Sequence, residues 1–159
     1  MKWRTFAYTT TLLVTFSLGQ QAVAADLGGY AGVNLNIRSG PGVRFPPVGV
    51  AGAGSELIIH GCVERYTWCD VSASGVRGWA SGAHLQFVHE ARRVYVPAYA
   101  VQVDIPILTF DLTSYWGEYY RDRDFYSEYD RWSAYQWQDE TPPGWRDRWD
   151  DYYDTHEYR

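Results

Sequence analysis

The chain has 159 residues, with 14 Lys and Arg against 19 Asp and Glu and a formal net charge of −5. This mildly acidic balance argues against a nucleic-acid partner, because phosphate binding requires clustered positive charge. The length fits one small domain followed by an extension.

Residues 1–24 have the pattern of an export signal. Lys2 and Arg4 give a positive start, a mostly apolar run follows, and Ala-Val-Ala at residues 22–24 is a small-x-small cleavage pattern. The run is shorter than the roughly 20 apolar residues that span a bilayer, although an uncleaved anchor is the alternative. We therefore expect an exported protein, periplasmic or extracellular, that has no stable membrane span after signal cleavage.

Short β-strands dominate the next part of the chain. Residues 26–32 are Gly-rich and are expected to form a flexible lead-in. After them, apolar alternation and β-branched runs predict strands at 33–38, 48–51, 56–61, 68–72, 76–80 and 86–88. Turn residues such as Ser39-Gly40-Pro41-Gly42 separate these runs, because Gly allows positive φ and Pro fixes its own. The pattern predicts an all-β barrel or sandwich.

The chain changes character after residue 88. Residues 89–113 are expected to form an extended linker, broken by Pro97 and Pro106. Residues 114–159 form an aromatic, acidic C-terminal extension with almost no aliphatic side chains, so they cannot build an ordinary Leu, Ile and Val core.

Two groups of aromatic residues in the extension have helical spacing, which predicts short helices and partial order to about residue 132. The groups are Trp116, Tyr119 and Tyr120, and Phe125, Tyr129 and Trp132. Beyond them we expect a loose acidic end. The extension has three possible roles: to fold back on the barrel, to stack on glycans, or to become ordered on a protein partner. Folding back is expected first, because so many exposed aromatic side chains would aggregate.

Five motifs follow one another in order between residues 34 and 85: NLNIRSGPG, FPPVG, GSELIIHG, WCDV and GVRGWASGAHL. The ordered set resembles the bacterial SH3-like (SH3b) domain. The family's Leu-Asn-Val-Arg-Ser-Gly-Pro opening stands here at residues 35–41, and its Gly-Trp-Val/Ala close at residues 78–80. The resemblance implies a small SH3-like barrel over residues 28–88. Together with the YWGEYYRDRDFY stretch, the cysteine pair looks like exported SH3-domain proteins of the rhizobial type.

The chain has two cysteines, Cys62 and Cys69. An even pair in an exported chain indicates a disulfide. The resemblance places the two at opposite ends of a hairpin loop, on adjacent antiparallel strands. Metal ligation and nucleophilic catalysis are the alternatives, but no matching Cys/His cluster accompanies the pair. We therefore expect no metal, no cofactor and no catalytic residue.

Exposed aromatic side chains that border loops are the usual contacts of a barrel that binds a ligand. If Cys69 and Val71 point inward, strand alternation turns Trp68 and Asp70 to the other face. Trp68 is therefore the first ligand-binding candidate, and Tyr66 in the preceding loop is expected to flank it. The alternative is that Trp68 only covers the edge of the barrel.

Two further residues are ligand-binding candidates for which a structural role is the alternative. Trp79 is either a ligand contact or a core residue, and Arg38 either pairs with a ligand carboxylate or stabilises its own turn. The resemblance implies a targeting module, since relatives often accompany cell-wall hydrolases and bind peptidoglycan peptides. We expect an exported, noncatalytic module that recognises a cell-wall peptide or glycan. The alternative is an envelope protein–protein interaction or structural role through the aromatic tail.

Overall fold

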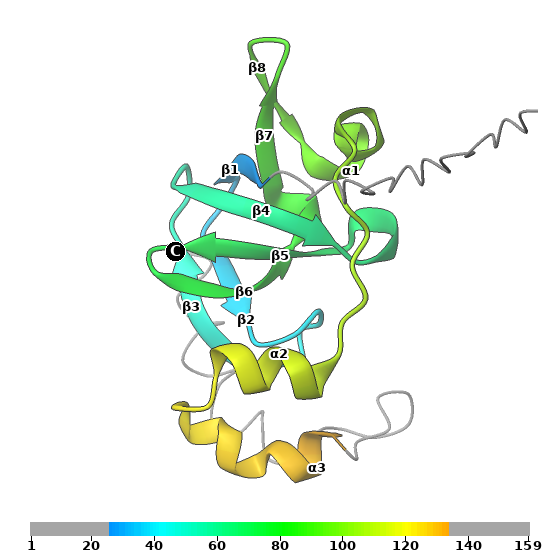
Figure 1. The fold of residues 1–159 in the computed structure, drawn as a ribbon. Coiled ribbons are helices and arrows are strands. Elements are labelled where there is room, and N and C mark those ends of the chain that lie inside the picture. Colours follow the sequence, from blue (N-terminus) through cyan, green and yellow to red (C-terminus); the bar gives the residue numbers. More distant parts are fainter. Residues whose placement is uncertain (1–25, 134–159) are drawn as a thin grey trace, which may run out of the picture.

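Eight antiparallel strands form one curled sheet in the computed structural model, which describes residues 26–133 (Figure 1). The strands are β1 (Leu27–Ala31), β2 (Leu35–Arg38), β3 (Pro47–Ala51), β4 (Glu56–Cys62), β5 (Trp68–Ala73), β6 (Val76–Ser81), β7 (Leu85–His89) and β8 (Arg92–Tyr95). Their order across the sheet is β3-β2-β6-β5-β4-β1-β7-β8. The all-β class is confirmed. The expected export signal and loose acidic end lie outside the described residues.

The core lies inside the curl of the sheet. It is built from alternate residues of the strands, as the apolar patterns predict. Its members include Leu35, Ile37, Leu57, Ile59, Val71, Ala80, Leu85 and Phe87, all of them buried. The apolar alternation over residues 33–38 is typical of a strand with one buried face, but all four residues of β2 are buried. The outward side of β2 is therefore also covered.

The Gly-rich start is a strand rather than a flexible lead-in. β1 lies between β4 and β7, with Leu27 opposite Ile59 and Gly29 opposite Phe87. A Cβ atom on Gly29 would lie 2.8 Å from Ile59 Cδ1 and 2.9 Å from the Gln86 carbonyl oxygen. Glycine is therefore needed here for close packing between strands. The glycine content alone indicated flexibility, because composition does not show which neighbouring strands lie close to a glycine.

The stretch expected as an extended linker contains regular structure. β8 pairs with β7, and the short helices α1 (Val96–Tyr99) and η3 (Ala100–Val103) follow. Residues 104–111 then run down the side of the sheet toward the next helix (Figure 1). The backbone N–H of Cys62 donates to the Pro106 carbonyl at 2.8 Å, and that of Leu108 donates to the Cys62 carbonyl at 2.7 Å. This pairing fixes the path of the chain along the end of β4.

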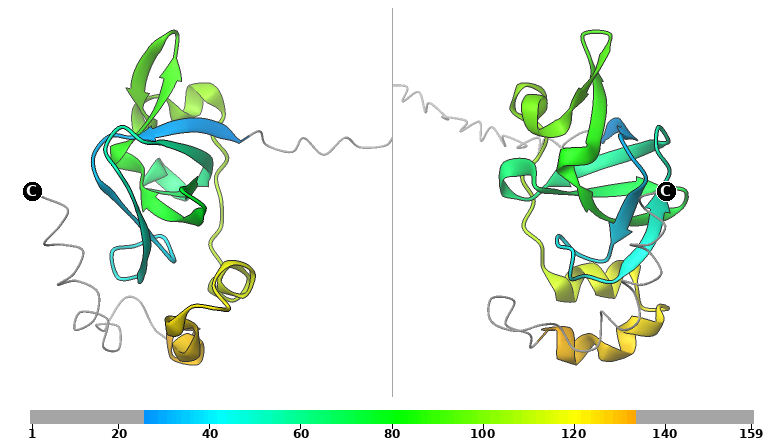
Figure 2. Two further views of the ribbon diagram at one scale, coloured as in Figure 1. Left: turned by 90° about the vertical axis from the view of Figure 1, so that its left-hand side faces the viewer. Right: turned by 180° about the vertical axis from the view of Figure 1, so that it is seen from behind.

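The extension folds back against one end of the barrel (Figure 2). It consists of α2 (Leu112–Tyr119), η4 (Asp124–Glu128) and α3 (Tyr129–Ser133). The buried aromatic side chains are Trp116, Tyr120, Phe125 and Trp132, and Trp132 stacks on Phe45 of the barrel with 5.9 Å between ring centroids. The short helices and the folding back are confirmed for residues 112–133. None of the helices in the described part of the chain is long and apolar enough to cross a membrane.

A disulfide joins Cys62 of β4 to Cys69 of β5, as expected. Both cysteines are fully buried. The two residues are directly opposite each other in the register of the strands. The bond therefore closes the β4–β5 hairpin loop.

Replacing both cysteines (C62A with C69A) should lower the free energy of unfolding by about 2.5 kcal/mol, the chain-entropy value for a loop this short. Urea unfolding with and without a thiol reductant measures the loss. Reductant should destabilise the unaltered protein by a similar amount and leave the double variant unchanged. Equal stability of the oxidised protein and the double variant would contradict this.

Candidate functional site

An open groove of about 610 Å³ lies where the barrel meets the extension. Its walls come from the loop after β2, from the start of β5 and from the chain that enters α2. The lining residues are Pro41, Gly42, Val43, Arg44, Phe45, Trp68, Phe110, Asp111 and Leu112. Most of them are apolar, and Val43 is 60% exposed. The groove is therefore a mostly apolar surface that the barrel and the extension build together.

Trp68 is the residue of β5 that reaches this groove. Cys69 and Val71 are fully buried in the core, so strand alternation turns Trp68 and Asp70 to the opposite side, as expected. Trp68 remains half-buried and lines the groove. Asp70 stands on the same side but is only 2% exposed. The extension covers that part of the strand, which the sequence pattern of β5 did not indicate.

The other three ligand candidates do not line the groove. Tyr66, the last residue of η1 (Glu64–Tyr66), is half-buried and packs against the core. Trp79 is 1% exposed, and its ring lies edge-on to Phe110 at 5.5 Å. Arg38 is 7% exposed, and its Nη1 donates to the Phe45 carbonyl at 3.1 Å. Burial thus supports the core role for Trp79 and the turn-stabilising role for Arg38.

Phe110 is a groove residue that the sequence did not reveal. Its ring meets Phe45 edge-on at 5.3 Å and Trp79 edge-on at 5.5 Å. Edge-to-face contacts of this kind stabilise aromatic pairs beyond the area they bury. Asp111 follows directly and caps α2, because its side chain accepts from the Ser114 N–H at 2.8 Å. The Asp-x-x-Ser spacing is the one sequence signal for the helix start.

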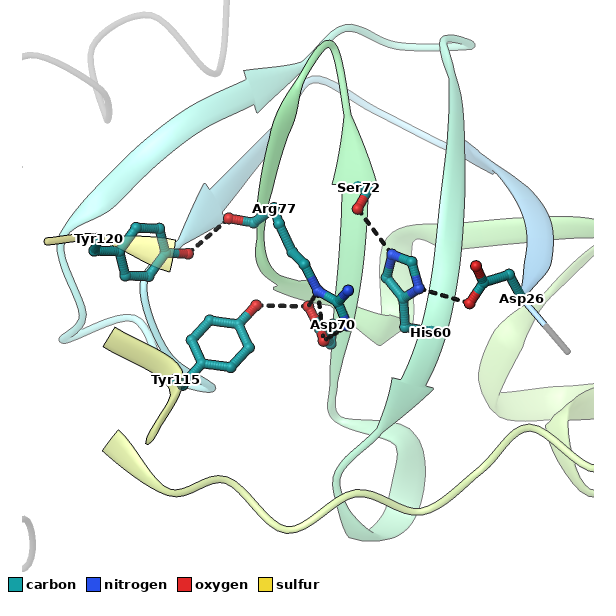
Figure 3. Close-up of polar contacts among 7 residues, drawn as sticks. All are labelled: Asp26, His60, Asp70, Ser72, Arg77, Tyr115 and Tyr120. Carbon is teal, nitrogen blue, oxygen red and sulfur yellow. Dashed lines mark hydrogen bonds and ion pairs between the residues drawn. The ribbon is translucent and has the colours of Figure 1, made fainter. Parts of the chain in front are cut away.

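A buried polar network ties α2 to the sheet (Figure 3). Arg77 of β6 donates hydrogen bonds to Asp70 from two of its nitrogens. Nη2 lies 2.7 Å from Oδ2, and Nε lies 3.1 and 3.2 Å from the two carboxylate oxygens. The Tyr115 hydroxyl donates to Asp70 Oδ1 at 2.6 Å, and the Tyr120 hydroxyl donates to the Arg77 carbonyl at 2.7 Å. Since Phe110 and Leu112 lie shortly before Tyr115 in the chain, this network sets the second wall of the groove.

Two more hydrogen bonds hold the extension on the barrel. The indole N–H of Trp116 donates to the Ser39 carbonyl at 2.8 Å, and both residues are fully buried. Arg123 Nη2 donates to the Val48 carbonyl of the edge strand β3 at 3.2 Å. These contacts place the extension on the turn that follows β2 and beside the edge strand β3.

The network keeps its donors protonated. Burial raises the pKa of Tyr115, and the nearby Tyr120 and Asp70 raise it further. Burial and the charge of Asp70 likewise raise the pKa of Tyr120. Burial alone would lower the pKa of Arg77, but the hydrogen bond to Asp70 and its negative charge outweigh this and leave the pKa raised. At neutral pH both phenols therefore donate and the Arg77 guanidinium stays charged.

Residues 33–86 match the family model described as Bacterial SH3 domain. This part of the chain is a bacterial SH3 domain. No curated protein matches the chain. The matched residues include β2 to β6 and Trp68, whereas Phe110, Asp111 and Leu112 lie outside them. Bacterial SH3 domains are a family of binding modules, and in this chain one wall of the groove comes from outside the domain.

Replacing Tyr115 with Phe should destabilise the protein by about 1.5–3 kcal/mol at neutral pH, because it removes a hydrogen bond to a buried carboxylate. The same network predicts a pH dependence. Folding raises the pKa of both phenols above their ordinary value of about 10, so this stability is complete below pH ~10 and is lost as the pH rises further. Thermal unfolding between pH 8 and pH 11 measures both effects.

The control is Tyr95→Phe, a change at a half-exposed tyrosine of β8 outside this network. The melting temperature of Tyr115→Phe should fall less steeply above pH 10 than that of the unaltered protein and of the control. Three parallel curves would contradict the assignment of this stability to Tyr115.

Proposed function

We propose that this bacterial SH3 domain is an exported binding module that recognises a cell-wall peptide or glycan in the groove beside Trp68. The observation that carries the proposal is the groove itself, where Trp68 of the domain and Phe110 and Leu112 of the extension line one concave surface. Aromatic and aliphatic walls of this size suit apolar peptide side chains and the flat faces of sugar rings. Recognition of this kind requires no catalysis.

Asp111, one of the two charged residues that line the groove, supports a polar ligand with N–H groups. The backbone N–H of Ser114 donates to Asp111 and holds the pKa of that carboxyl below its usual range. The carboxylate therefore stays ionised and accepts hydrogen bonds from amide or ammonium groups. Peptides and amino sugars carry such groups. The buried Cys62–Cys69 disulfide supports export, because disulfides persist in oxidising compartments.

Trp68→Ala should weaken retention of the protein on purified peptidoglycan by about tenfold or more, the size of a hot-spot aromatic contact. Co-sedimentation of the purified protein with the insoluble wall fraction measures it. Tyr95→Ala is the matched control, since Tyr95 is a half-exposed aromatic residue outside the groove. The proposal fails if the unaltered protein is not retained, or if Trp68→Ala is retained equally well.

The extension favours a second function, an envelope protein partner or a structural role. Tyr126 and Tyr129 are half-buried on η4 and α3, with 5.7 Å between their ring centroids. Partly exposed tyrosines combine a large apolar area with a polar tip, which is typical of protein interfaces. By contrast, Trp116, Phe125 and Trp132 are buried against the barrel and are not available to a partner.

If the extension recruits a partner, Tyr126→Ala combined with Tyr129→Ala should remove a stoichiometric envelope protein that co-purifies with the unaltered chain. Trp68→Ala should retain that protein. Affinity purification after cross-linking in intact cells, followed by mass spectrometry, provides the comparison. A partner that persists in the double tyrosine variant, or that Trp68→Ala alone removes, would exclude this role of the extension.

A further inference from the structure

Three polar side chains form a hydrogen-bonded chain on the sheet, outside the groove (Figure 3). His60 Nδ1 lies 2.7 Å from Asp26 Oδ1, and His60 Nε2 lies 2.8 Å from the Ser72 hydroxyl oxygen. A carboxylate can only accept, so Nδ1 carries a proton, and in the neutral form of the ring Nε2 is the acceptor for Ser72. Hydroxyl, imidazole and carboxylate thus follow one another in the same order as the nucleophile, the base and the orienting group of a catalytic triad. The same two ring nitrogens make the two contacts.

A β-bulge places His60 in this chain. In the β4–β5 pairing Ile59 is opposite Val71 and Gly61 is opposite Asp70, so His60 is the extra residue. Bulges re-aim side chains and occur often beside functional sites. Ser72 points away from the core because Val71 and Ala73 on either side of it are buried.

Asp26, the partner of His60, directly precedes β1, the strand that the sequence did not predict. The pairing of Leu27 with Ile59 brings Asp26 beside β4. His60 is only 13% exposed in its side chain, whereas Asp26 is 61% exposed. The imidazole is therefore shielded between two partners, while the carboxylate faces water.

Ser72 also lines a concavity of about 670 Å³ on the outer side of β1, β4 and β5. Ile58 and Val88 give it apolar walls and are 42% and 52% exposed. Gly28 leaves space, since a Cβ atom built there would meet nothing within 4 Å. The concavity therefore has room for an apolar group of modest size beside Ser72.

We propose that Ser72 is a nucleophile, activated by His60, for esters whose acyl group is apolar. His60 Nε2 takes the proton of the Ser72 hydroxyl while the oxygen bonds to the ester carbonyl carbon. The imidazolium returns that proton to the leaving alkoxide as its C–O bond breaks, which releases the alcohol and leaves an acyl ester on Ser72. Water, deprotonated by His60, then attacks the acyl carbon. The bond to Ser72 breaks, the serine regains its proton, and a carboxylic acid is released.

Asp26 is a positioning residue in this scheme, because it fixes the imidazole tautomer and stabilises the imidazolium. The activity goes beyond the proposed recognition at the groove and departs from the expectation of a chain without catalysis. A merely structural role is the competing explanation, in which His60 only fastens Asp26 and the start of β1 to the sheet. In that role Ser72 would react no faster than an ordinary surface serine such as Ser74, so reactivity separates the two explanations.

The test treats the protein, purified after export, with a fluorophosphonate probe and locates the adduct by peptide mass spectrometry. We expect one adduct, on Ser72, and none in Ser72→Ala. His60→Gln should slow labelling by about 10²-fold or more, the usual contribution of a general base. Ser74→Ala is the matched control, because Ser74 is an exposed serine that lines the same concavity. Ser72 in this variant should be labelled at the same rate as in the unaltered protein.

A second measurement is hydrolysis of p-nitrophenyl butyrate above the buffer rate, which Ser72→Ala should abolish and Tyr95→Ala, outside both sites, should leave unchanged. This assay contains no cell wall, so failure of wall binding and failure of this site are distinguishable. Absence of a Ser72 adduct in the unaltered protein overturns the proposal, and this result does not depend on the folding of any variant. Equal labelling of Ser72 and Ser74 overturns the proposal as well. So does labelling of Ser72 at an unchanged rate in a folded His60→Gln variant.

Discussion

The arrangement of this molecule depends on one buried carboxylate, Asp70. A carboxylate that is 2% exposed is costly unless charged or hydrogen-bonding partners surround it. Arg77 supplies the charge from the neighbouring strand, and Tyr115 supplies a further donor from α2. Satisfying Asp70 therefore brings the extension onto the barrel. The extension in turn buries Asp70 and so strengthens the pair that holds it.

The groove is a consequence of that docking. Trp68 stands two residues before Asp70 on the same side of β5, and Phe110 and Leu112 come shortly before Tyr115. A barrel with the extension elsewhere would retain Trp68 but would lack the facing wall. The groove is thus specific to a chain that combines the SH3 domain with this aromatic segment, and it differs from a surface that the domain alone would present.

The order of the strands has a comparable effect on the outer side of the sheet. β1 lies between β4 and β7, which brings Asp26 to the bulge at His60. The two polar clusters share β5, with Asp70 and Ser72 on the same side of it. One is buried by the extension and fastens it, whereas the other stays beside an open concavity. The difference lies in what covers each of them.

The sequence by itself determined the all-β class, the strands from β2 to β7, the disulfide and the helices of the extension. These features depend on local patterns, namely alternation, turn residues, paired cysteines and helical spacing, which act over a few residues. Only the tertiary structure decided that residues 27–31 form a strand, that Trp79 and Arg38 are buried, and which residues face Trp68. Each of these depends on contacts between distant segments, such as Trp116 on Ser39 or Asp26 on His60. No local pattern records those contacts, because they arise from the register of the sheet and the docking of the extension.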